Sequence, residues 1–175
     1  MKRIAWGITG AGHFLEESIK IVEKLEFVDL FISLAGEEVL RMYKLSKRVE
    51  NLKKKNVRIF RQRLESAPIA GWFYKPFYMV LVISPATSNT VAKFVCGISD
   101  SLITNLFAQA GKSKVPIVVL PTDVSEIIKS QSPKGKVTIY PRRIDLENVK
   151  KLRSFERVKV VKSTEELENY LESIA

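Results

Sequence analysis

Residues 79–90, MVLVISPATSNT, join an apolar strand to a polar helix start. The run Met79 to Ser84 is rich in Val and Ile, as in strands that are buried on both faces of a parallel sheet. Thr87-Ser88-Asn89-Thr90 then place four hydrogen-bonding side chains at the start of a helix, more than one N-cap needs. Ligands of open parallel sheets bind at the carboxyl ends of the strands, so this junction predicts a ligand site.

Short apolar runs alternate with longer amphipathic stretches on both sides of this junction. The alternation predicts an α/β protein with a three-layer, Rossmann/flavodoxin-like, open and mainly parallel sheet that carries helices on both faces. The expected strands are Ile4–Ile8, Val28–Ser33, Val57–Phe60, Met79–Ser84, Ile117–Leu120, Val137–Tyr140 and Val158–Val161. The expected helices are Phe14–Leu25, Glu37–Lys54, Thr87–Phe94, Asp100–Ala110, Leu146–Ser154 and Thr164–Ile174.

Length and composition limit the classes of protein to which the chain can belong. A chain of 175 residues with 46% apolar content fits a single domain over residues 1–175. The sequence has no run of eighteen apolar residues and reaches strand-like sequence close to Met1, so we expect a cytoplasmic protein without a membrane segment. One cysteine, Cys96, and one histidine, His13, exclude an internal disulfide, a four-cysteine cluster and a conventional zinc cage. Redox chemistry would therefore need an organic cofactor, and Cys96 is expected to be a buried apolar residue.

The ends of the first two expected strands also carry ligand-type residues. Residues 7–13, GITGAGH, form a small-residue turn that lets backbone N–H groups approach a phosphate, although such turns also serve packing alone. His13 could contact an anion, transfer a proton or cap the helix. Ser33, before the next helix, could donate to the same phosphate or act only as a cap.

Two segments depart from the alternation. Residues 66–76 contain two prolines, a glycine and three aromatic residues, which indicates an irregular loop that covers the core, forms a subunit interface or closes over a planar ligand. Residues 130–136, with Pro133 and Gly135, indicate a mobile connection.

Much of the net charge of +10 is concentrated between Arg41 and Arg63, where ten Lys or Arg residues accompany one acid, Glu50. This basic segment is either a solvated surface or a landing site for an acidic protein, a phosphorylated ligand or nucleic acid. Aromatic residues are not interleaved with the basic ones, which argues against nucleic acid.

The stretch from Pro85 to Leu102 resembles a known family. PATSNT at 85–90, Ala92-Lys93 and GISDSL at 97–102 are similar to the P-A-S-A-N-T, A-K and G-I-A-D-x-L motifs of the homo-oligomeric flavin-containing cysteine decarboxylase superfamily. The resemblance extends from Ile4 to about Asp123. It implies an FMN cofactor and a homo-oligomer, either a trimer or a dodecamer. The FMN-binding residues that it implies, together with the first loop, are Thr9, Gly10, Ala11, Gly12, Ser33, Pro85, Ala86, Thr87, Ser88, Asn89, Thr90 and Thr122.

The departures from the family are equally informative. Decarboxylases of the family carry a catalytic histidine between strands three and four, but residues 61–78 contain none. Their P-x-M-N-x-x-M-W motif after strand five is replaced by PTDVS at 121–125. The layout therefore looks most like the archaeal flavoproteins of the dihydromethanopterin-reductase type.

The function expected from this resemblance is that of an FMN-dependent oxidoreductase or electron carrier. An acidic donor such as ferredoxin would dock on the basic segment, and dihydromethanopterin or a similar acceptor would be reduced. No catalytic side chain is assigned. The alternatives are a decarboxylase of the phosphopantothenoylcysteine type and a non-catalytic nucleotide-binding module.

Overall fold

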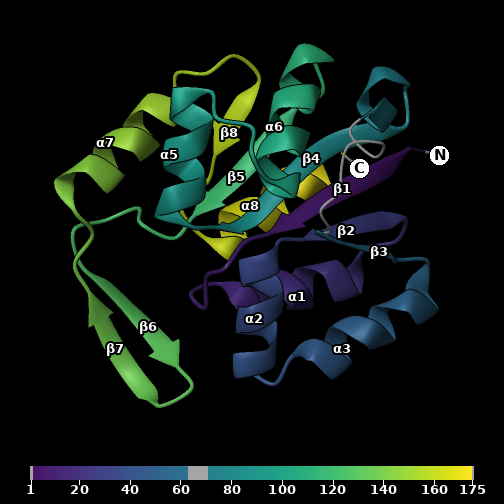
Figure 1. Cartoon of the computed structure of the whole chain (residues 1–175). Coiled ribbons are helices and arrows are strands. Elements are labelled where there is room, and N and C mark those ends of the chain that lie inside the picture. The colour runs from purple at the N-terminus through teal and green to yellow at the C-terminus, as the bar shows by residue number, and fades with distance from the viewer. Residues whose placement is uncertain (1, 63–70, 175) are drawn as a thin grey trace.

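Six parallel strands form the centre of the fold in the order β3-β2-β1-β4-β5-β8 (Figure 1). The computed structural model describes residues 2–62 and 71–174. The six strands are β1 (Arg3–Ile8), β2 (Val28–Ile32), β3 (Arg58–Arg61), β4 (Tyr78–Ala86), β5 (Ile117–Pro121) and β8 (Val158–Val160), and every neighbouring pair is parallel. The expected α/β class with an open parallel sheet is confirmed.

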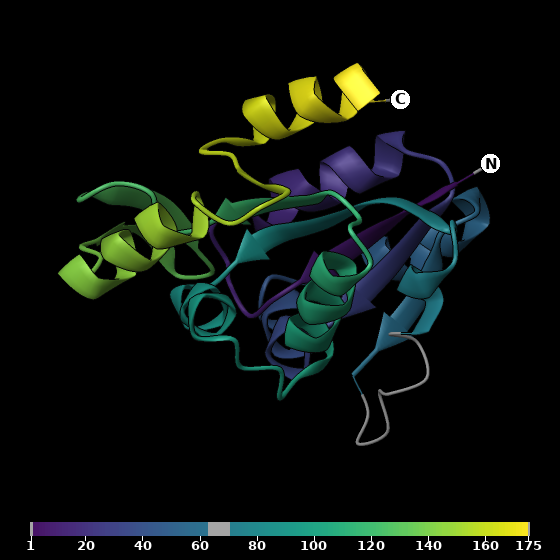
Figure 2. The same cartoon turned by 90° about the horizontal axis from the view of Figure 1, so that it is seen from above.

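Helices cover both faces of this sheet (Figure 2). The helices are α1 (Leu15–Lys24), α2 (Leu34–Met42), α3 (Ser46–Asn51), α5 (Ser88–Cys96), α6 (Leu102–Lys112), α7 (Arg143–Leu152) and α8 (Thr164–Ile174), with short 3₁₀ turns η1 (Leu52–Lys55) and η2 (Gly71–Tyr74). One core cluster packs α1, α2, α3 and α8 on one face, and a second packs α5, α6 and α7 on the other. Strands that are enclosed on both sides need mainly apolar residues, which explains the largely apolar sequences of β1, β2 and β5.

The strand order reverses between β1 and β4. The connection after β1 leads to α1 on one face, whereas the connection after β4 leads to α5 on the other face. Adjacent loops that part in opposite directions leave a crevice at the carboxyl ends of the strands. This switch point is where the MVLVISPATSNT stretch ends.

The single helix expected over Glu37–Lys54 is wrong. Lys44 has a positive φ of 58°, so the chain turns between α2 and α3. A left-handed residue cannot continue a right-handed helix, and the amphipathic pattern on either side of Lys44 conceals this break.

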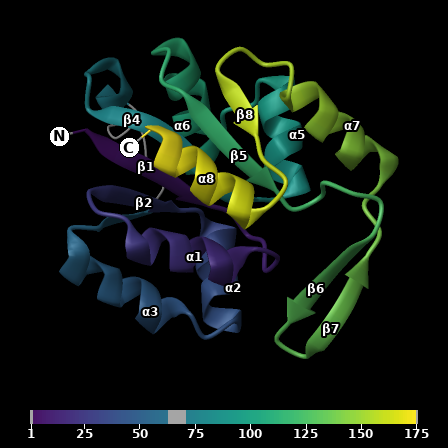
Figure 3. The same cartoon turned by 180° about the vertical axis from the view of Figure 1, so that it is seen from behind.

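The region after β5 also differs from expectation. β6 (Ile128–Ser132) and β7 (Gly135–Ile139) pair antiparallel as a separate two-stranded hairpin, which stands away from the main sheet in Figure 3. The connection expected over Ser130–Lys136 is wrong, because most of it belongs to β6 and β7. The strand expected over Val137–Tyr140 is present as β7, but it belongs to the hairpin and not to the main sheet. Only Ile128 of the hairpin strands is fully buried, because the hairpin pairs locally instead of entering the core.

Two smaller expectations concern surface and core. Cys96, expected to be buried, is exposed at the last position of α5, one residue before Gly97 ends the helix.

Residues 66–70 of the expected loop lie outside the described residues. In η2, Phe73 is buried and Trp72 packs against the core, whereas Tyr74 is 63% exposed. Within the described parts of the chain, no helix is long and apolar enough to cross a membrane.

A buried ionic cluster holds the amino-terminal edge of the sheet. The Asp29 carboxylate is fully buried and accepts hydrogen bonds from Arg3 Nε at 2.7 Å, Arg58 Nε at 2.7 Å and the Tyr78 hydroxyl at 2.8 Å. The Arg58 guanidinium also lies within 6 Å of the Phe60, Trp72 and Phe77 rings. Burial and the neighbouring Asp29 carboxylate raise the pKa of Tyr78, so its hydroxyl stays a donor. Asp29 thus links β1, β2, β3 and β4.

We expect Asp29→Asn to lower the free energy of unfolding by about 3 kcal/mol, because it leaves two arginines without their buried counter-charge. Urea denaturation followed by circular dichroism measures this loss. The matched control is Lys24→Met, which removes the exposed Lys24–Glu168 pair and should cost less than about 1 kcal/mol. Equal losses in both variants would show that the cluster has no special role.

Candidate ligand site at the switch point of the sheet

A cavity of ≈ 350 Å³ opens at the switch point, and we call it the switch-point cavity. Its lining comes from the carboxyl ends of β1, β2 and β3 and from the starts of α2, α5 and α6. The lining residues are Thr9, Gly10, Ser33, Leu34, Ala35, Gln62, Thr87, Asn89, Thr90, Lys93 and Ser101. Its volume lies within the usual range of small-molecule sites, roughly 300–1,000 Å³.

The N-termini of α2 and α5 meet at this cavity. Ser33 is the N-cap of α2 and accepts a hydrogen bond from the Gly36 N–H at 3.0 Å, and Thr87 is the N-cap of α5 and accepts from the Thr90 N–H at 3.2 Å. The capping role expected for both residues is therefore present. A hydroxyl that accepts still has its own proton to donate, so Ser33 can cap α2 and also bind an anion. Free N–H groups and helix dipoles at both N-termini favour a phosphate in this cavity.

Thr9 connects the two sides of the cavity. Its hydroxyl donates to the Pro85 carbonyl at 2.8 Å and accepts from the Thr87 N–H at 2.9 Å. The end of β1 is therefore held against the start of α5. This bridge lies at the point where the connections after β1 and β4 leave for opposite faces of the sheet.

The glycines of the first loop are required by α2. A Cβ at Gly10 would lie 2.5 Å from the Cβ of Ala35, and a Cβ at Gly12 would lie 1.9 Å from the Tyr43 hydroxyl. At Gly10 only glycine lets the loop lie this close to α2, which keeps its backbone N–H groups near the cavity, whereas at Gly12 the overlap is with the end of the Tyr43 side chain.

Among the described residues that line the cavity, Lys93 is the one that carries a charge. Its ammonium lies 2.8 Å from each carboxylate oxygen of Asp100, and this contact lowers the pKa of Asp100. The Lys93 side chain is only 26% exposed, so its charge remains close to the cavity. The cavity therefore offers hydroxyl donors together with an ammonium that is already paired with Asp100.

The structure brings together half of the residues named from the sequence. Thr9, Gly10, Ser33, Thr87, Asn89 and Thr90 line the cavity, whereas Ala11, Gly12, Pro85, Ala86, Ser88 and Thr122 do not. Thr122 instead lies behind the cavity, where its N–H and hydroxyl contact the Ala86 carbonyl.

Sequence reasoning missed Leu34, Ala35, Gln62, Lys93 and Ser101. Lys93 and Ser101 belong to the stretch that carries the family resemblance, so that stretch was the signal that could have identified them. Gln62 follows β3 directly, so the strand-end rule could have found it.

His13 lies outside this cavity. It lines a second cavity of ≈ 600 Å³ between α1 and the β6–β7 hairpin. Burial lowers the pKa of His13, and the nearby Glu17 and Asp123 carboxylates oppose this only in part. The imidazole is therefore mainly neutral at pH 7. Since the chain has one histidine, none of its own imidazoles lines the switch-point cavity.

Ion pairs neutralise part of the basic segment. Arg48 pairs with Glu23 and Glu16, Arg61 with Glu37 and Glu50, and Lys53 with Glu50. Arg58 belongs to the buried Asp29 cluster. Arg41, Lys44 and Lys47 are exposed and form no ion pair with any residue in the described ranges, so they are available to a partner.

Three features together define the chain as a flavin-binding α/β protein. They are the fold, the switch-point cavity with its phosphate-binding groups, and the PATSNT sequence at the start of α5. The Flavoprotein family model matches residues 1–173, and the chain belongs to this family.

The chain is similar to a dihydromethanopterin reductase (acceptor) of Methanosarcina mazei, with 43% identity over 142 residues, 75% of this chain and 59% of the relative. The crystal structure of Burkholderia xenovorans DmrB in complex with FMN superposes with a TM-score of 0.87 and 44% identity, covering 98% of this chain and 94% of that chain. A flavin prenyltransferase of Aquifex aeolicus is 33% identical over 69% of this chain and 66% of that protein. The chain thus spans about 59% of the length of the Methanosarcina relative.

We expect Gly10→Ala to lower the free energy of unfolding by about 1–3 kcal/mol, because the new Cβ overlaps Ala35 and pushes the loop from α2. Chemical denaturation measures the change. Gly111→Ala is the matched control, since this exposed position in α6 has no atom within 4 Å of an added Cβ, and it should gain up to about 1 kcal/mol. A neutral Gly10→Ala would refute the tight contact.

Proposed function

We propose that the chain binds FMN in the switch-point cavity and acts as an FMN-dependent oxidoreductase or electron carrier. The observation that carries this proposal is the match, at 44% identity over 98% of this chain, to a protein whose structure contains FMN. The cavity fits the cofactor independently, because two helix N-termini, several hydroxyls and a lysine surround it.

The chain's own residues would supply binding and electrostatics. The α2 and α5 N-termini, with Ser33 and Thr87, would hold the phosphate, and the Asn89 amide would offer a further polar contact. Lys93, whose ammonium is also paired with Asp100, would lie beside an anionic cofactor. When bound, FMN supplies an isoalloxazine ring that carries hydride or single electrons. No side chain needs to be chemically altered in such a reaction.

The decarboxylase alternative has less support in this chain. The one histidine, His13, lines the other cavity, and Gln62 occupies the end of β3 beside the switch-point cavity. A neutral amide cannot serve as a general base. The relative with prenyltransferase activity is also less similar than the reductase, at 33% against 43% identity.

The donor and acceptor belong to the same proposal. The named activity of the Methanosarcina relative supports dihydromethanopterin or a similar pterin as the acceptor. The exposed cations Arg41, Lys44 and Lys47 support an acidic donor such as ferredoxin.

The proposal also includes the oligomeric state: the chain forms a homo-oligomer, either a trimer or an assembly of several trimers such as a dodecamer. DmrB is described as a cubic protein cage, and a UbiX-like decarboxylase of Escherichia coli as dodecameric. In this chain, exposed apolar side chains gather on and around the hairpin at Ile127, Val137, Ile139, Tyr140 and Ile144. A two-stranded hairpin is marginal by itself, so a second copy packed on this surface would stabilise it.

We expect wild-type protein to be yellow and to bind FMN, whereas Asn89→Ala and Lys93→Met should each raise the FMN Kd by about tenfold, since each removes a polar contact without affecting the core. Flavin absorbance of the purified protein and titration of FMN fluorescence provide the measurement. Asn169→Ala, the same change at an exposed position of α8, is the control and should bind normally. Colourless protein that stays FMN-free after reconstitution would favour the non-catalytic nucleotide-binding module.

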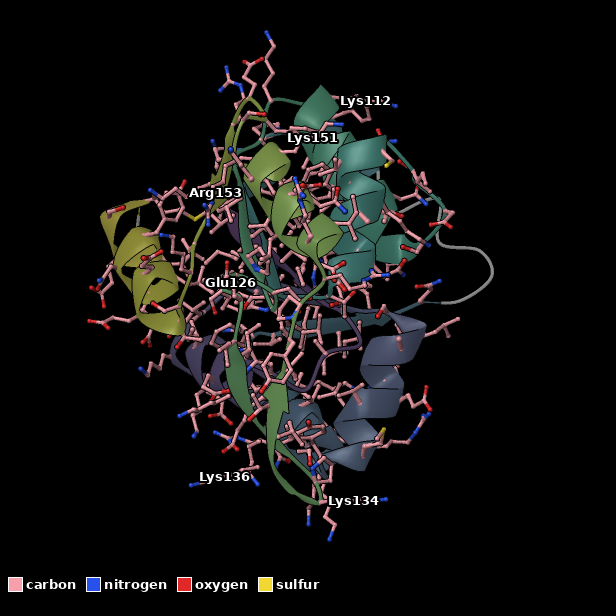
Figure 4. The ribbon with its side chains drawn as sticks, turned by 90° about the vertical axis from the view of Figure 1, so that its left-hand side faces the viewer. Lys112, Glu126, Lys134, Lys136, Lys151 and Arg153 are labelled. Atoms are coloured by element: carbon pink, nitrogen blue, oxygen red, sulfur yellow. The ribbon has the colours of Figure 1, made fainter. Side chains whose placement is uncertain are left out.

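The ferredoxin proposal has its own test. Changing Arg41, Lys44 and Lys47 to Glu should slow reduction of bound FMN by reduced ferredoxin about tenfold or more at low salt, because it reverses the charge that attracts the donor. Reduction by dithionite should not change. The control triple variant places Glu at Lys112, Lys151 and Arg153, which lie near α6 and α7 in Figure 4. Equal slowing in both triple variants would show that net charge, not this surface, controls the rate.

A further inference from the structure

The Lys93 side chain reaches the wall of the switch-point cavity, and its ammonium is held by Asp100. The ammonium lies 2.8 Å from each carboxylate oxygen of Asp100, which is not itself among the residues that line the cavity. We infer that Asp100 is a positioning residue, which fixes and offsets the Lys93 charge, so that the pair sets the reduction potential of a flavin bound in this cavity. The inference rests on the proposed function, because it requires FMN in the switch-point cavity.

The position of Asp100 follows from the local sequence GISDS at 97–101. Gly97 has a positive φ of 71° and ends α5, and the Ile98 N–H then bonds back to the Lys93 carbonyl at 2.8 Å. This is a helix ending that depends on glycine and turns the chain back along the helix. Asp100 is thereby returned to the side of α5 that carries Lys93, seven positions earlier in the chain.

The start of α6 fixes Asp100 from the other side. Ser101 is the N-cap of α6 and forms a capping box with Thr104, in which the Ser101 hydroxyl accepts from the Thr104 N–H at 3.3 Å and the Thr104 hydroxyl accepts from the Ser101 N–H at 2.9 Å. Asp100 directly precedes this cap, at the positive end of the α6 dipole, where an anion is favoured. The hydrogen bond from Lys93 lowers the pKa of Asp100, so its carboxylate is charged at neutral pH.

The composition of the cavity wall gives this ion pair its electrostatic importance. Lys93 shares one face of α5 with Asn89 and Thr90, which are four and three positions away and also line the cavity. Since the other described lining residues are uncharged, the Lys93–Asp100 pair decides the charge at this wall. The Lys93 side chain is 26% exposed and that of Asp100 is 54% exposed, so water screens the ammonium less than the carboxylate.

Charge at this wall acts on the reduction potential in a definite direction. Reduction makes a flavin more negative, so a nearby cation favours the reduced form and a nearby anion favours the oxidised form. A Lys93 ammonium without a counter-charge would therefore raise the potential of bound FMN, whereas the intact pair with Asp100 keeps it lower. A lower potential makes bound FMN the stronger reductant, which suits a protein that passes electrons to an acceptor.

The test is the midpoint potential of the full chain saturated with FMN, measured by anaerobic spectroelectrochemical titration. Asp100→Asn keeps the shape of the side chain but removes its charge, and it should raise the potential by about 30 mV, equivalent to about a tenfold change in the equilibrium constant of a two-electron couple. Lys93→Met should lower the potential, and by more, because Lys93 is the less exposed partner. The double variant should fall between the two single variants, since it removes both charges.

Two controls accompany these variants. Asp100→Glu keeps the carboxylate and should keep the wild-type potential. Glu168→Gln removes one carboxylate from the exposed Lys24–Glu168 pair, which lies with α1 and α8 on the face of the sheet opposite α5, and it should also leave the potential unchanged.

The direction of the shifts separates an electrostatic role from a structural one. Shifts of the same sign in Asp100→Asn and Lys93→Met would overturn the inference, because loss of a structural contact affects both variants alike. An equal shift in Glu168→Gln and Asp100→Asn would also overturn it, since net charge would then be the cause. Protein that stays free of FMN after reconstitution would refute the proposed function and the inference together, whereas FMN-loaded variants with unchanged potentials would refute the inference alone.

Discussion

The Thr9 hydroxyl holds together the part of the fold on which the ligand site depends. At the switch point β1 and β4 stop pairing, because their connections leave for opposite faces of the sheet, and buried backbone groups there need other partners. Thr9 is 2% exposed, and its hydroxyl is a partner for two of these backbone groups. It donates to the Pro85 carbonyl and accepts from the Thr87 N–H. The neighbouring Trp6 Nε1 donates to the Ser84 carbonyl at 2.9 Å, and the Ser18 and Ser84 hydroxyls pair at 2.7 Å. The crevice therefore opens above a layer of satisfied polar groups.

The sheet could be predicted from the sequence because burial on both faces imposes a direct pattern on it. Val28–Ile32 and Ile117–Pro121 are apolar at almost every position, and the structure buries every residue of both strands. The hairpin could not be predicted in the same way, since Lys129, Gln131, Lys136 and Thr138 are polar and its pairing is local. The break at Lys44 and the exposure of Cys96 depend on how helices meet their neighbours, which periodicity does not report.

The candidate site shows the same division. Ser33 and Thr87 were accessible to sequence reasoning because each follows a strand and caps a helix, so local chemistry places them. Lys93 and Gln62 reach the cavity only because α5 and β3 are brought to the same edge by the packing of the whole sheet. Conversely, Thr122 has a suitable side chain at the correct strand end, but its hydroxyl is turned toward the Ala86 carbonyl. Position along the chain identifies the edge of the sheet, whereas tertiary packing decides which side chains point into the cavity.

Helix α2 controls both cavities through the glycines of the first loop. Ala35, at its start, excludes a side chain from Gly10 beside the switch-point cavity, and Tyr43, at its C-cap, lies against Gly12 beside the cavity between α1 and the β6–β7 hairpin. Tyr43 also bonds to the hairpin, so the position of α2 sets the distance between α1 and that wall. Because packed elements move as units, a shift of α2 along its axis would change the openings of both cavities together. The same short helix therefore borders both cavities, through Ala35 at its start and Tyr43 at its C-cap.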